Sequence, residues 1–91
     1  MKTFKDLAAI VRSYLTGAIS LTDLSREFEA LYFAGPDLVE DEAHPFLIGI
    51  WVRVNEVTRG AWTEDALKAH LKQNLENYEA WFAMQKPAAE G

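Results

Sequence analysis

Carboxylates are the residues of this sequence best suited to chemistry, and half of them lie in one segment. Between Asp23 and Glu42 there are seven acidic residues and one basic residue, Arg26, whereas the rest of the chain has seven acids and eight bases. The net charge of −5 therefore comes from this one segment. Such a concentration creates a local field that attracts cationic groups and speeds their arrival. An acidic balance also argues against nucleic acid as the partner.

We predict that these carboxylates form a docking surface for a basic protein, because each can accept hydrogen bonds from lysine or arginine. The candidate residues are Glu27, Glu29, Asp37, Glu40, Asp41 and Glu42. Asp23 is a weaker candidate, since it also suits the first turn of a helix. A solvated acidic loop without any partner is the alternative that the composition leaves open.

No catalytic or metal-binding motif is present in the sequence. The absence of cysteine excludes a disulfide framework, a thiolate zinc site and a cysteine nucleophile. Neither a glycine-rich phosphate loop nor a His-Glu-x-x-His motif occurs. The adjacent carboxylates of residues 40–42 do not converge on one substrate atom. We predict a protein that is not an enzyme and has no cofactor or metal; a metal site built from His44, His70 and loop carboxylates is a much weaker alternative.

The apolar run from Phe46 to Val54 is the element around which the rest of the chain would pack. Its nine residues are too few to cross a bilayer, which needs about 20. Its β-branched residues would suit a strand, but no second strand candidate could pair with it. Pro45 suits the first position of a helix. We predict a helix over Pro45–Thr58, buried on most faces, with His44 outside it because a residue before proline disfavours the helical conformation.

Three further segments have apolar residues at helical spacing, namely residues 3–16, 20–34 and 63–84. Each begins with a residue that favours a helix start, and these residues are Thr3, Ser20 and Thr63. Gly17 and Gly35 are natural helix stops. The stripe of the second segment that we expect to be buried comprises Leu21, Leu24, Phe28, Leu31 and Tyr32.

These elements predict an all-α fold, an antiparallel four-helix bundle with a buried third helix. Residues 1–84 would form a single helical-bundle domain and residues 85–91 a flexible C-terminal tail. The acidic connector, residues 36–44, would join the second helix to the third. Because the first residues lack the pattern of a signal peptide, we expect a cytoplasmic protein, a monomer or weak dimer, with no membrane partner. Trp62 lies in the turn after the third helix and is a candidate binding anchor.

Several phrases of the sequence carry a resemblance to a known family. They are Tyr14-Leu15-Thr16-Gly17-Ala18-Ile19-Ser20, Phe28-Glu29, Leu31-Tyr32, the acidic stretch Asp37–Glu42 and Thr63-Glu64-Asp65-Ala66-Leu67. Over roughly residues 4–80 the chain resembles the colicin D-type immunity proteins, which are small helical proteins of bacterial self-protection. The resemblance implies a four-helix bundle that binds the basic catalytic domain of a cognate toxin, typically a transfer-RNA-cleaving nuclease. The acidic surface would cover the toxin's active site in place of RNA phosphates.

The leading hypothesis is therefore an immunity protein that blocks the basic active site of a toxin nuclease. The alternative is a small helical adaptor that binds another protein through an exposed apolar groove, using Trp62 or Leu38 and Val39. Salt separates the two, because it screens attraction between charges and leaves apolar contacts largely intact.

Overall fold

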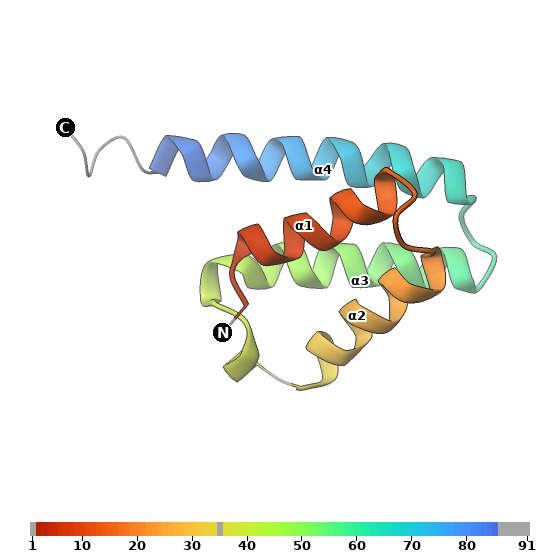
Figure 1. Ribbon diagram of the computed structural model, residues 1–91, viewed down its shortest axis with the longest axis horizontal. Helices are drawn as coiled ribbons and strands as arrows, with labels where there is room; N and C mark the ends of the chain where they lie inside the picture. Colours follow the sequence, from red (N-terminus) through yellow and green to blue (C-terminus); the bar gives the residue numbers. More distant parts are fainter. Residues whose placement is uncertain (1, 35, 86–91) are drawn as a thin grey trace.

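The computed structural model describes residues 2–34 and 36–85, and it confirms the predicted all-α four-helix fold. The helices are α1 Phe4–Leu15, α2 Leu21–Ala34, α3 His44–Thr58 and α4 Glu64–Gln85 (Figure 1). Two 3₁₀ turns, η1 Pro36–Leu38 and η2 Asp41–Ala43, occupy the acidic connector. Among the described residues, no helix has both the length and the apolar character needed to cross a membrane. Residues 86–91 of the predicted tail lie outside the described residues, and Gln85 ends α4.

The predicted capping residues begin their helices. At α1 the Thr3 side chain accepts a hydrogen bond from the Asp6 amide, and the Asp6 carboxylate accepts one from the Thr3 amide. The bond from the Thr3 amide, and then a second one that the Thr3 hydroxyl donates to the same carboxylate, lower the pKa of Asp6 below its ordinary value. At α4 the Thr63 hydroxyl accepts a hydrogen bond from the Ala66 amide at 3.1 Å. Helix ends at Gly17 and Gly60 use positive φ angles of 86° and 83°, which glycine adopts without strain.

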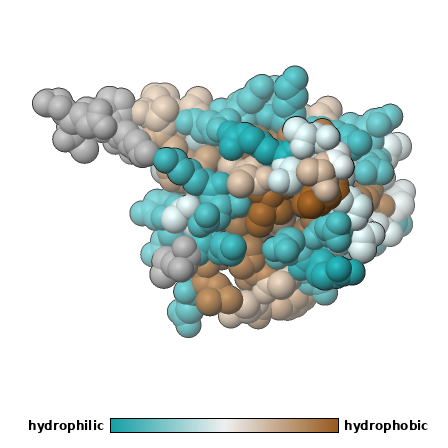
Figure 2. Space-filling model, in the orientation of Figure 1, coloured by the Kyte–Doolittle hydropathy of each residue, from teal (hydrophilic) through white to brown (hydrophobic). Residues whose placement is uncertain are grey.

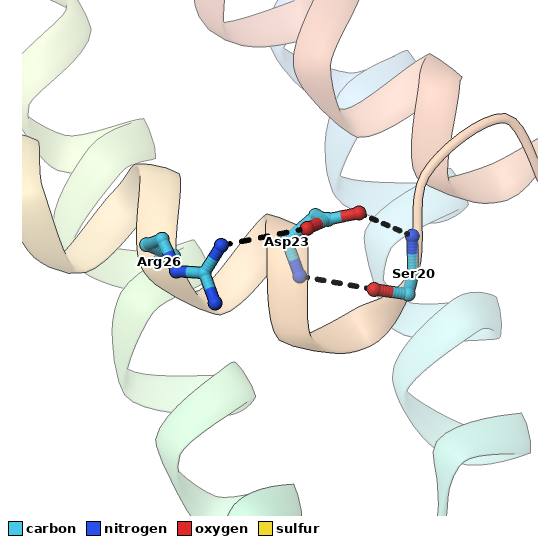
Figure 3. A network of polar contacts seen from close by, with 3 residues as sticks. All are labelled: Ser20, Asp23 and Arg26. Carbon is cyan, nitrogen blue, oxygen red and sulfur yellow. Dashed lines mark hydrogen bonds and ion pairs between the residues drawn. The ribbon is translucent and has the colours of Figure 1, made fainter.

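The start of α2 explains why Asp23 differs from the other acids of its segment. Its carboxylate accepts a hydrogen bond from the Ser20 amide, and its amide donates to the Ser20 hydroxyl (Figure 3). Arg26, one turn later, approaches the same carboxylate at 3.8 Å. Asp23 is thus engaged by its own helix, as its position in the first turn predicts.

Helix α3 is central to the packing. It lies against α2 and α4, with α4 running antiparallel to it, and α1 packs on α2 and α4 (Figure 1). Four of its side chains are buried, namely Phe46, Leu47, Ile50 and Val54. Burial does not extend around the whole helix, because Ile48 and Val52 on its outer side stay 49% and 41% exposed. The other three helices therefore cover one side of the apolar run and leave part of the other side open.

His44 differs from the prediction that placed it outside the third helix. Its φ of −58° and ψ of −46° are helical, and its amide donates to the carbonyl of Asp41. Its Nε2 atom also lies 2.9 Å from the carbonyl oxygen of Val39. The prediction was wrong because η2 leads directly into α3, and these local contacts outweigh the effect of the following proline.

A buried tyrosine, Tyr14, links α1 to α4 through a side-chain hydrogen bond. Tyr14 is 3% exposed, and its hydroxyl donates a 2.6 Å hydrogen bond to Oε2 of Glu64. Burial, and then this hydrogen bond, raise the pKa of Tyr14 above its ordinary value of 10. A proton held more tightly in the folded state stabilises the fold below pH 10, and this contribution is lost as the pH rises above 10.

The Tyr14 hydrogen bond predicts a measurable alkaline effect. Tyr14→Phe should lower the free energy of unfolding by about 1 kcal/mol at pH 7, because one hydrogen bond is removed. Above pH 10 the wild type should lose its advantage over the variant. Urea unfolding of both proteins between pH 7 and pH 11 measures this difference. Parallel pH profiles for the two proteins would contradict it.

Candidate functional site

The acidic connector is held in a defined place against the start of the chain. The Lys2 amide donates to the carbonyl of Leu38 at 2.7 Å, and the Glu40 amide donates to the carbonyl of Lys2 at 2.9 Å. Between these two bonds Val39 is 1% exposed and anchors the connector in the core, whereas Leu38 is 47% exposed. Because the connector is already ordered, little conformational entropy is lost when its carboxylates bind a partner.

The three consecutive acids of the connector have different environments. Glu40 is half-buried, and its Oε1 atom accepts a 2.9 Å hydrogen bond from the Phe4 amide at the start of α1. Asp41 and Glu42 are exposed, as is Asp37 in η1. Among the described residues, no hydrogen bond or ion pair engages the carboxylates of these three exposed acids. Glu40 is therefore mainly a structural carboxylate, and the exposed three are available to a partner.

Substitution of Glu40 should separate its structural role from that of its neighbours. Glu40→Ala should lower the free energy of unfolding by about 1–2 kcal/mol, because the Phe4 amide loses a charged acceptor. Glu40→Gln should restore part of the loss by keeping an acceptor in place. Glu42→Ala, at an exposed neighbour, should change stability by less than about 0.5 kcal/mol. Thermal unfolding compares the three variants, and equal effects of Glu40→Ala and Glu42→Ala would contradict the assignment.

Glu27 and Glu29 do not lie on one side of α2. Glu27 lines a hollow together with Lys2 and with Ile10 of α1. Glu29 lines a different hollow, together with Phe33 of α2 and Thr58 of α3. Residues two apart on a helix point in widely different directions. The six predicted acids therefore do not all belong to one compact surface.

Trp62 lies apart from the acidic connector. The turn between α3 and α4 is at one end of the bundle, and η1 and η2 are at the other (Figure 1). Trp62 is half-buried there, with the guanidinium carbon of Arg53 4.9 Å from its ring centroid and the His70 ring edge-on at 5.6 Å. Burial, and then the charge of Arg53, lower the pKa of His70. Trp62 thus packs within its own end of the molecule.

The sequence did not predict the aromatic cluster that lies on the surface. Tyr32, Phe33 and Trp51 pack together, with ring centroids 4.3 Å apart for Tyr32 and Trp51 and 5.9 Å apart for Phe33 and Trp51. Tyr32 is 40% exposed, although its place in the stripe of α2 predicts burial, and Phe33 is 71% exposed. The wrong prediction for Tyr32 follows from the open outer side of α3, which leaves the end of this stripe uncovered.

A second aromatic group lies beside the acidic connector. Phe82 of α4 stacks on Phe4 of α1 at 4.6 Å, and Trp81 meets Phe82 edge-on at 4.8 Å. Apolar residues also reach the surface elsewhere, and Figure 2 shows a hydrophobic strip framed by hydrophilic residues on one face. In the sequence Trp81 is far from Glu42. Only the fold brings it near Glu42, with which it lines one hollow.

The described residues contain no group of three or more histidine, aspartate or glutamate side chains that could hold a metal ion. The arrangement is one of exposed carboxylates beside aromatic rings, which suits the binding of a cationic protein surface. Comparison with models of protein families, with curated proteins and with solved structures found no match for this chain.

Proposed function

We propose that this protein is an immunity protein that binds a basic toxin nuclease and blocks its active site, with a transfer-RNA-cleaving nuclease as the expected target. The observation that supports this most directly is the set of three exposed carboxylates, Asp37, Asp41 and Glu42, on a connector that backbone hydrogen bonds hold in place. Carboxylates fixed in this way can replace RNA phosphates at a cationic site. The resemblance of the sequence to colicin D-type immunity proteins supports the same function.

Calorimetric titration tests the proposal directly. We expect the cognate toxin nuclease domain to be encoded beside the gene of this protein, and the purified protein is titrated with that domain at low and at high salt. We expect tight binding that weakens steeply as salt rises, because the attraction between exposed charges is screened, and we expect loss of nuclease activity at a one-to-one ratio. The absence of binding at low salt would refute the proposal.

A helical adaptor is the second candidate function, and the Tyr32–Phe33–Trp51 cluster is the observation that favours it. Exposed aromatic side chains are frequent anchors in protein interfaces. In this case binding to a partner would resist salt and would depend on Phe33, the most exposed member of the cluster at 71%. Phe33→Ser should then abolish binding, whereas an immunity protein that uses the acidic connector should tolerate this change.

A further inference from the structure

Two adjoining hollows separate the acidic connector from the C-terminal half of α4, and each has a volume of about 370 Å³. The first hollow is lined by Glu42, Pro45, Asn77, Tyr78 and Trp81. The second hollow is also lined by Glu42, together with Thr3, Phe4, Lys5, Glu40 and Phe82. Glu42 thus stands between two aromatic-walled spaces. We call the pair of hollows the aromatic groove.

The groove lies where α4 extends past the other helices. The last turns of α4 project beyond the start of α3 (Figure 1). Trp81 there is 47% exposed, a large fraction for the largest apolar side chain. The carboxylate of Glu42 has no hydrogen bond or ion pair within residues 2–34 and 36–85. The Glu42 carboxylate and the exposed Trp81 indole ring therefore line one hollow that is large enough for a side chain.

The same pairing of residue types occurs at the other end of the molecule, where a cation fills it. The guanidinium of Arg53 lies over the Trp62 ring and forms an ion pair with Glu56. An arginine suits both contacts at once, because its planar group stacks on aromatic rings and donates to carboxylates. The first hollow of the groove has the tryptophan and the glutamate, but no lysine or arginine lines it.

We propose that the hollow between Trp81 and Glu42 binds an arginine side chain from a basic segment of the protein partner. The second hollow, which Lys5 makes less favourable for a cation, takes a neighbouring apolar side chain of the same segment. This inference rests on the proposed function for the nature of the partner. It adds that α4, outside the acidic segment, supplies half of the binding site and selects arginine in particular.

Nuclear magnetic resonance tests the groove with a defined probe. The indole N–H signals of the three tryptophans are assigned with single Trp→Phe variants and followed during titration with acetyl-Gly-Arg-Leu-Arg-Gly-amide. We expect a saturable shift of the Trp81 signal and no shift of the Trp62 signal, whose ring Arg53 already covers. The citrulline analogue of the peptide keeps the shape and loses the charge, and it should bind at least fivefold more weakly.

A pair of matched variants tests whether the shift of the Trp81 signal comes from binding of the peptide in the aromatic groove. Glu42→Gln should weaken binding of the arginine peptide several-fold, whereas Glu76→Gln, at an exposed acid elsewhere on α4, should leave it unchanged. An equal effect of the two variants, or equal binding of the citrulline peptide, would overturn the proposal. A Trp81 signal that shifts with protein concentration alone would also overturn it, because a second copy of the chain would then be the occupant.

Binding measurements with the nuclease domain distinguish an error about the groove from an error about the immunity function. Trp81→Leu should lower affinity for the nuclease about tenfold, whereas Phe33→Leu, at an exposed aromatic residue outside the groove, should not. Normal nuclease binding by Trp81→Leu would refute the groove and leave the immunity function standing. A wild type that binds the arginine peptide at Trp81 but not the nuclease would refute the immunity function and leave the groove standing.

Discussion

Replacement of Phe46 by alanine is expected to cost about 3–5 kcal/mol of the free energy of unfolding, a large share of the roughly 5–15 kcal/mol that holds a small domain folded. Phe46 is fully buried, and its ring meets those of Phe4 at 5.0 Å and Tyr78 at 5.2 Å in edge-on contacts. Removal of the ring leaves a cavity among α1, α3 and α4 that rigid helices cannot close. Urea unfolding followed by circular dichroism measures the loss.

The control for Phe46 is another phenylalanine with a different environment. Phe33→Ala removes the same ring from a side chain that is 71% exposed, and should cost less than about 1 kcal/mol. Because Phe46 lies in the first turn of α3, which directly follows η2, its loss should also increase hydrogen exchange at the Glu40 amide, which bonds to the Lys2 carbonyl. A Phe46→Ala protein within 1 kcal/mol of the wild type would contradict this account of the core.

The positions of the helices could be predicted from the sequence because their signals are local. Thr3, Ser20 and Thr63 are caps that act on amides within one turn, and Gly17 ends α1 by its own conformational freedom. The observed starts lie within one residue of the predicted ones. Such signals need no knowledge of the rest of the fold.

Burial around α3 was harder to predict, because it depends on how much surface the neighbouring helices can cover. The apolar run at residues 46–54 indicates burial on most sides. With α1 at 12 residues and α2 at 14, the cover is incomplete, and Ile48 and Val52 remain about half exposed. The exposed Tyr32–Phe33–Trp51 cluster results from the same shortage of cover.

The candidate site also depends on contacts between distant parts of the chain, which the sequence does not reveal. Glu40, Asp41 and Glu42 are equivalent acids in the sequence, yet only Glu40 reaches the Phe4 amide, 36 residues away. Trp81 and Glu42, which line one hollow, are likewise far apart in the chain. Composition could therefore identify the acidic segment, but not which of its carboxylates support the fold and which face aromatic rings.

Reversal of two exposed acids, Asp37→Lys together with Asp41→Lys, is expected to weaken binding to the proposed toxin nuclease at least a hundredfold. If the protein has the proposed immunity function, the double variant should also fail to protect cells that express the nuclease. Each reversal replaces an attraction with a repulsion, and a loss of about 1.4 kcal/mol at each position already corresponds to a factor of ten. Neither residue has a hydrogen bond or ion pair among the described side chains, and neither lines the aromatic groove. The fold should therefore persist.

The matched control is Asp65→Lys together with Glu76→Lys, which changes the net charge by the same amount on exposed positions of α4. If overall charge alone attracts the nuclease, both double variants lose affinity equally and the acidic connector is not the binding surface. If the connector binds the nuclease, the control retains most of its affinity while Asp37→Lys, Asp41→Lys does not. Calorimetry gives the two dissociation constants, and circular dichroism shows that both proteins remain helical. Glu40 is left unchanged in both, because its bond to the Phe4 amide would confuse lost binding with lost stability.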